Sequence, residues 1–111
     1  MRKPVSINRN HLFLRAYRSR PYYVSPYFVT YVVRRKSGEL AAGITASKKI
    51  GGAVQRNRAR RLVKAAIRQV IKRYDVPCDV VIVCRKAILD KKSTELVPIL
   101  RAHLRKAGVI S

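Results

Sequence analysis

One segment of the chain, residues 53–73, sets the strongest limit on how the protein can fold. Its apolar residues recur about every 3.6 positions, which predicts a long helix with an apolar stripe along one side. The residues of the stripe are Ala59, Leu62, Val63, Ala66, Ile67, Val70 and Ile71. The other side of the helix carries the cations Arg56, Arg60, Arg61, Lys64, Arg68 and Lys72. Such a helix must bury its apolar side against other elements and leave its cationic side open to solvent or to an anionic partner.

The segments on either side of this helix have the composition of strands. Residues 22–33 are rich in aromatic and β-branched side chains, although Pro26 interrupts them near the start. A turn at residues 36–39 allows residues 40–46 to return as the second arm of a hairpin. Residues 79–85 form a continuous apolar run, which is typical of a strand that is buried on both faces.

Two further helices are predicted near the ends of the chain. Residues 8–17 carry apolar side chains at helical spacing, which indicates a short helix. A last helix is marked by leucines four residues apart and ends at Gly108, while Pro98 leaves its first residue open. The order helix, two strands, helix, strand, helix predicts an α+β sandwich of helices on a sheet, folded as one domain over residues 1–111.

The net charge narrows the choice of partner. The chain has 26 lysines and arginines against 5 acids, a formal net charge of +21, and its first acid is Glu39. Such a field repels itself unless a polyanion lies against it, so nucleic acid is the expected partner. An anionic membrane is the weaker alternative, because no long helix with a broad apolar face and few other contacts stands out. No signal peptide or apolar spanning segment is evident, so we expect a cytoplasmic protein without membrane contact.

The sequence predicts a protein that binds rather than one that reacts. Hydrolysis by two metal ions needs several converging carboxylates, and the five acids here are scattered along the chain. His11 and His103 lie at opposite ends of the sequence. Cys78 and Cys84 share one predicted strand, which holds them too far apart for a disulfide. We therefore expect buried reduced thiols, no metal site and no catalytic residue on this chain.

The glycine-rich loop at residues 47–52 and the start of the central helix predict a phosphate-binding surface. Lys48 and Lys49 lie on this loop, which leads into the positive end of the helix, where anions are favoured. Arginine forks suit bidentate phosphate contact, and Asn57 can meet a base edge or a 2′-hydroxyl. Cations in the first helical turn oppose the helix dipole, a cost that phosphates would offset. The alternative is a basic face that is merely solvated.

Four aromatic residues predict a second surface. Phe13 and Tyr17 lie four residues apart on one helical face, and Tyr27 and Tyr31 share a face of the first predicted strand. If the short helix lies along that strand, the two elements form a groove that can stack the bases of a single strand. The alternative is that these rings belong to the core, which Phe13 taken alone would favour.

Several motifs around the central helix resemble those of one protein family. They are Ser47-Lys48-Lys49-Ile50-Gly51, Ala53-Val54, Arg56-Asn57-Arg58 and Arg61-Leu62. Together they resemble the signature segment of the bacterial ribonuclease P protein family, whose hallmark is an Arg-Asn-Arg helix. The likeness continues at Phe13, at Tyr17 and at residues 28–31 and 79–86, so it covers nearly the whole chain.

The resemblance implies a fold and a function. The fold is a mostly antiparallel four-stranded sheet packed with helices, with a left-handed βαβ crossover like that in domain 2 of ribosomal protein S5, although such crossovers are rarely left-handed. The function is that of a protein subunit whose partner RNA carries the catalysis and removes the 5′ leader of precursor tRNA. Mg²⁺ would belong to the RNA active site, and no obligatory protein partner is implied.

The resemblance also assigns residues to each RNA. Contacts with the catalytic RNA would come from Lys48, Lys49, Arg56, Asn57, Arg58, Arg61, Lys64 and Arg68, and we add Arg60 because it lies on the cationic side of the same helix. Contacts with the leader would come from Phe13, Tyr17 and Tyr31, and we add Tyr27 because strand alternation places it on the same face as Tyr31. A ribosomal protein and a protein-only nuclease are the competing interpretations. The sequence leaves open the type of RNA subunit, dimerisation of the assembly, direct binding of divalent ions by the protein, and the roles of Tyr22 and Tyr23.

Overall fold

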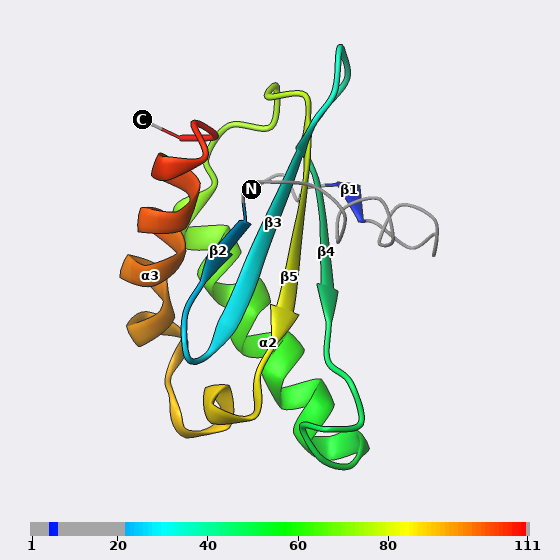
Figure 1. The fold of residues 1–111 in the computed structure, drawn as a ribbon, viewed down its shortest axis with the longest axis vertical. Coiled ribbons are helices and arrows are strands. Elements are labelled where there is room, and N and C mark those ends of the chain that lie inside the picture. Colours follow the sequence, from blue (N-terminus) through cyan, green and yellow to red (C-terminus); the bar gives the residue numbers. More distant parts are fainter. Residues whose placement is uncertain (1–4, 7–21, 111) are drawn as a thin grey trace.

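The computed structural model describes residues 5–6 and 22–110, and Figure 1 shows its helices and strands. Helices α2 and α3 cover one face of the sheet (Figure 1). The short helix predicted at residues 8–17 lies outside the described residues. The elements in chain order are β1 (Val5–Ser6), β2 (Tyr22–Val24), β3 (Phe28–Arg34), β4 (Ala41–Thr45), α2 (Ala53–Val70), β5 (Cys78–Cys84), the 3₁₀ turn η1 (Lys86–Asp90) and α3 (Ser93–Lys106).

The sheet has the strand order β1-β4-β5-β3-β2 and is mixed. Strands β2, β3 and β5 pair antiparallel, whereas β4 pairs parallel with β5 and with β1. The α+β class and the four strands β2 to β5 are confirmed, with two-residue β1 added at one edge. The four strands β2 to β5 are mostly antiparallel, as the resemblance implies, because two of their three pairings run antiparallel. Strand β1 adds a second parallel pairing at the edge.

The predicted hairpin between residues 22–33 and 40–46 is wrong. Strand β5 lies between β3 and β4 and pairs with both along their lengths. The apolar run of β5 explains this position, because a strand that is apolar on both faces is most stable at the centre of a sheet. All residues of β5 except Val83 are buried, as predicted.

The connection from β4 to β5 through α2 is a left-handed crossover. In Figure 1 both strands point down the page, α2 lies behind the sheet, and β5 lies to the left of β4. Crossovers of this kind are right-handed in about 98% of cases, so this one is a rare topology. It agrees with the fold that the family resemblance implies.

The core lies between the sheet and the two helices. Helix α2 contributes five residues of the predicted apolar stripe, Ala59, Val63, Ala66, Ile67 and Val70, while Leu62 is only partly buried. They pack with alternate residues of β5 and with the leucines of α3 in one cluster. The helix ends at Val70, three residues before the predicted end, because Ile71 takes an extended conformation and is itself buried.

Helix α3 begins at Ser93, so Pro98 lies inside it. The Glu95 carboxylate accepts a hydrogen bond of 3.0 Å from the backbone N–H of Lys92 and caps the first turn. At the other end, Gly108 has a φ of +77°, and the backbone N–H of Val109 donates to the Leu104 carbonyl. This glycine-terminated end is the one that the sequence predicts.

His103 joins α3 to the sheet from within the core. Its Nδ1 is hydrogen bonded to the Thr30 hydroxyl at 2.9 Å, and its ring contacts the rings of Phe28 and Tyr23 at centroid distances of 5.4 and 5.9 Å. Burial lowers the pKa of His103 from 6.5, and the charge of Lys106 lowers it further against the opposing effect of a hydrogen bond with the Val24 backbone. The folded protein therefore holds this histidine neutral.

This arrangement predicts a loss of stability in mild acid. As the pH falls below 6.5, the unfolded chain takes up a proton on His103 before the folded chain does, so the free energy of unfolding decreases. Urea titrations between pH 7.5 and about pH 5 measure this slope. The variant His103→Gln, which removes this titrating group, should lose part of the slope. Equal slopes for the parent and His103→Gln would contradict the account.

Candidate nucleic-acid interface

The polar side of α2 is an exposed cationic face. Because the apolar stripe of the helix is buried, the residues between its members point outward. Arg58, Arg61, Lys64 and Arg68 are exposed, as is Asn57, while Arg56 and Arg60 are half-buried. We call these residues, together with exposed Lys48 and Lys49, the cationic face. It contains all nine residues that we expect from the sequence to contact the catalytic RNA.

The charges of this face are not neutralised by the ion pairs found among residues 22–110. Those pairs are Arg35 with Asp79 at 3.1 Å, Arg73 with Asp75 at 2.8 Å and Lys91 with Glu95 at 3.5 Å. One polar contact lies within the face itself: the Arg60 guanidinium donates a 3.1 Å hydrogen bond to Oδ1 of Asn57. Asn57 therefore orients Arg60 without reducing its charge.

The loop before α2 presents its lysines at the positive end of the helix. Ile50 is buried and anchors the loop, and its backbone N–H donates to the Ser47 carbonyl at 3.0 Å. Gly52 is the N-cap, so no side chain caps the first turn, and that turn contains no acid. Helix N-termini favour anions, and here neither a capping side chain nor an acid takes that place.

Gly51 allows this loop to reach the helix. Its φ is +147°, a backbone angle that residues other than glycine rarely adopt. A Cβ atom at this position would lie 3.1 Å from Cβ of Gln55. Both facts require glycine at this position.

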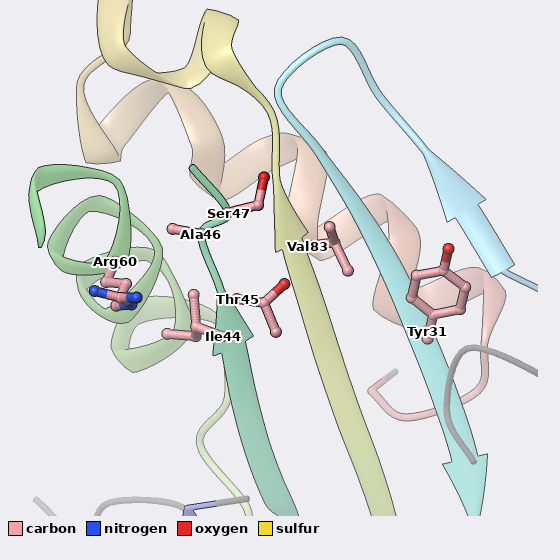
Figure 2. A pocket seen from close by; sticks show the side chains of 7 residues that line it. All are labelled: Tyr31, Ile44, Thr45, Ala46, Ser47, Arg60 and Val83. Atoms are coloured by element: carbon pink, nitrogen blue, oxygen red, sulfur yellow. The ribbon is translucent and has the colours of Figure 1, made fainter. Parts of the chain in front are cut away.

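The sheet face opposite the helices carries the second candidate surface. Tyr31, Val33 and Val83 pack there around buried Ala41 and Val81. A hollow of about 610 Å³ runs from this face across the end of β4 to α2 (Figure 2). Figure 2 shows Tyr31 on β3 at one side and Arg60 on α2 at the other. Its lining residues are Tyr31, Ile44, Thr45, Ala46, Ser47, Arg60 and Val83.

Of the four residues predicted to contact the leader, only Tyr31 is found to line this hollow. Phe13 and Tyr17 lie outside the described residues. Tyr27 does not share the face of Tyr31, so that expectation is wrong: Tyr27 packs against the helix-side core, with Nζ of Lys91 5.1 Å from its ring centroid. The reason is local, because Ser25 Oγ accepts hydrogen bonds from the backbone N–H groups of Tyr27 and Phe28. These bonds hold residue 27 in a turn, where strand alternation does not apply.

The hollow also joins two sites that the sequence treats as separate. Arg60 belongs to the cationic face and lines the same cavity as Tyr31. The sequence predicts no role for Tyr22, but its ring lies 5.5 Å from that of Tyr31, centroid to centroid. The pairing of Tyr22 with Tyr31 depends on the tight turn at Ser25, which the sequence marks only by Pro26.

Three of the five acids, Asp75, Asp79 and Glu95, form ion pairs away from the cationic face. Asp79 is buried beside Arg35, whose guanidinium also donates to the carbonyls of Cys78 and Glu39. The Arg73 hydrogen bond lowers the pKa of Asp75, and the Lys92 backbone N–H lowers that of Glu95. Burial raises the pKa of the Cys84 thiol to about 12. Within residues 22–110 no three potential metal ligands come together, and no described helix has the length and apolarity to cross a membrane.

A mixed sheet with helices on one face, a cationic helix and a hollow with an aromatic wall define a small α+β protein suited to polyanions. The family model described as Ribonuclease P matches residues 1–108. The ribonuclease P protein component of Chloroflexus aurantiacus is 33% identical over 99% of this chain and 82% of its own length. That of Shouchella clausii is 30% identical over 100% of this chain and 92% of its own.

Solved structures give the same result. The RNase P protein of Staphylococcus aureus superposes with a TM-score of 0.79 at 26% identity, covering 98% of this chain and 100% of that one. The RNase P protein of Thermotoga maritima has a TM-score of 0.64 at 23% identity, which supports the fold alone. The chain therefore belongs to the ribonuclease P protein family. It is the protein subunit of the ribonucleoprotein endoribonuclease that matures the 5′ end of tRNA.

The loop geometry predicts a difference between two adjacent glycines. Gly51→Ala should lower the free energy of unfolding by about 1–3 kcal/mol, because alanine would be strained at this φ. Gly52→Ala should cost less, since Gly52 has a φ of −74° and its nearest contact is the end of the Gln55 side chain. Urea denaturation of both variants measures the difference, and equal losses would count against the loop geometry.

Proposed function

We propose that the cationic face binds the catalytic RNA of ribonuclease P. The observation that carries this proposal is that α2 buries its apolar stripe while its cations stay outward and outside the ion pairs of the described residues. Phosphates would neutralise these cations, meet the amides at the start of α2 and offset the repulsion within the face. Asn57 adds a group that can hydrogen bond with a base edge or a 2′-hydroxyl.

The hollow at the end of β4 is proposed to hold the 5′ leader of precursor tRNA. Tyr31 offers a ring for base stacking, and Arg60 offers a cation for a phosphate on the other side of the same cavity. Stacking tolerates any base, which suits a leader whose sequence varies. Phe13 and Tyr17 remain predicted leader contacts on the strength of the sequence. Tyr27 is left out of the proposed site, since it packs on the helix side of the sheet.

Catalysis is proposed to reside in the RNA, with Mg²⁺ held there. Three of the five carboxylates of the chain, Asp75, Asp79 and Glu95, are engaged with neighbouring cations of the protein. They therefore serve the fold, and the protein contributes binding and charge neutralisation. A subunit with this role works where precursor tRNA is processed, which is the cytoplasm in bacteria.

The contact with the catalytic RNA predicts a change in salt dependence. Replacing two exposed cations, as in the double variant Arg58→Gln/Arg61→Gln, should weaken binding and reduce the slope of log K against log salt by about 2, since each phosphate contact contributes about 1. Binding titrations over a salt series measure this slope. Arg73→Gln is the control, because Arg73 is exposed but already paired with Asp75. An unchanged slope in the double variant would contradict the assignment.

The leader contact predicts selective weakening of one substrate. Tyr31→Ala should weaken binding of precursor tRNA to the assembled enzyme by about 1–3 kcal/mol, the usual range for one stacked base. Mature tRNA has no leader, so its affinity should stay the same. Tyr31→Phe keeps the ring and serves as the control. A ribosomal protein or any other binder of folded RNA would show equal effects on the two tRNAs, and that outcome would overturn the leader site.

A further inference from the structure

Tyr22 is an exposed ring stacked beside a proposed leader contact. It is 46% exposed, and the other aromatic side chains of the described residues are buried or half-buried. Strand register pairs it with Tyr31, and the two rings are tilted by 32° at a centroid distance of 5.5 Å. One edge of Tyr22 therefore contacts Tyr31 while much of its surface meets solvent. A tyrosine whose only task was to stabilise the sheet would gain more from being covered.

Tyr22 continues a row of side chains across the sheet face opposite the helices. Thr45 of β4 pairs with Val83 of β5, which pairs with Val29 of β3. Tyr31 follows two residues along the same face of β3, and its partner Tyr22 lies on β2, at the edge. Since neighbouring strands are about 4.8 Å apart, the row spans roughly 14 Å from β4 to β2. The hollow covers its β4 end, and Tyr22 lies beyond the hollow at the other end.

The position of α2 indicates in which order a bound leader would meet the residues of this row. The cationic face, which is proposed to meet the catalytic RNA, lies on the β4 side, where Arg60 enters the hollow. A leader that leaves the catalytic RNA would thus pass Arg60 first, then Tyr31 and then Tyr22. Each step away from the cleavage site moves the strand toward the β2 edge.

We propose that Tyr22 is a further leader-binding residue, which stacks a nucleotide farther from the cleavage site than the one on Tyr31. This inference rests on the proposed leader site. It adds a second stacking position at the edge of the sheet, so longer leaders gain affinity that shorter ones lack. Stacking does not read the identity of a base, so the gain depends on leader length and hardly on leader sequence.

The test is a series of precursor tRNAs whose leaders are shortened one nucleotide at a time, bound to the assembled enzyme. Tyr22→Val removes the ring and keeps a side chain that strands favour, so the sheet edge is preserved. It should weaken binding about fivefold for long leaders, the lower end of the range for one stacked base. The loss should vanish at a leader length at which Tyr31→Ala still weakens binding.

Two controls separate stacking from a general effect on the strand. Tyr22→Phe keeps the ring and should bind every leader as the parent does. Val24→Ala changes another exposed side chain on the same face of β2 and should also leave binding unchanged. Thermal unfolding confirms that each variant is folded.

The remaining outcomes would overturn the inference in distinguishable ways. If Tyr22→Val weakens binding from the same leader length as Tyr31→Ala, Tyr22 acts only by holding Tyr31 in place. If Tyr22→Val has no effect at any length while Tyr31→Ala does, Tyr22 contacts no nucleotide and the leader site itself stands. If neither variant depends on the leader, the proposed leader site fails as well.

Discussion

The packing of α2 against the central strand and α3 is the interaction on which the rest of this structure depends. The buried stripe of the helix meets alternate side chains of β5 and the leucines of α3 in one cluster. Burial of each large aliphatic side chain contributes about 1.5–3 kcal/mol, so this contact is a main source of stability. The same packing fixes the rotation of the helix about its axis. With the stripe inward, the cations are held outward along about 27 Å of helix.

Not all cations of this chain have the same role. Arg34 donates a 2.8 Å hydrogen bond to the Ala107 carbonyl at the end of α3, and Lys72 donates to the Arg68 carbonyl near the end of α2. Arg105 and Lys106 lie in the last turn of α3. Cations at helix C-termini are favoured by the helix dipole, so these residues have a use within the fold. The first turn of α2 lacks that explanation, because the dipole opposes cations there. This contrast favours an anionic ligand at the start of α2 over one at the C-terminal ends of α2 and α3.

The sequence predicted where the helices and strands lie better than it predicted which strands pair with one another. Helical and continuous apolar patterns located α2, α3 and β5, because burial depends on which side of an element is apolar. The place of β5 between β3 and β4 is a long-range pairing, which a local turn signal at residues 36–39 does not reveal. The handedness of the crossover came from the family resemblance alone. Within the site, the exposure of the α2 cations followed from periodicity. The positions of Tyr22 and Tyr27 depend on the turn at Ser25, where hydrogen bonds of the Ser25 side chain override strand alternation.

The central claim is that the outward side of α2 is the surface that RNA covers, and arginine reactivity tests it most directly. Arginines of the protein, alone and assembled with ribonuclease P RNA, would be modified with a glyoxal reagent and mapped by mass spectrometry. The account predicts that Arg58, Arg61 and Arg68 react in the free protein and are protected in the assembly, while the reactivity of Arg73, which is exposed and paired with Asp75, is the same in both states. Equal reactivity of the three α2 arginines in the two states would contradict it.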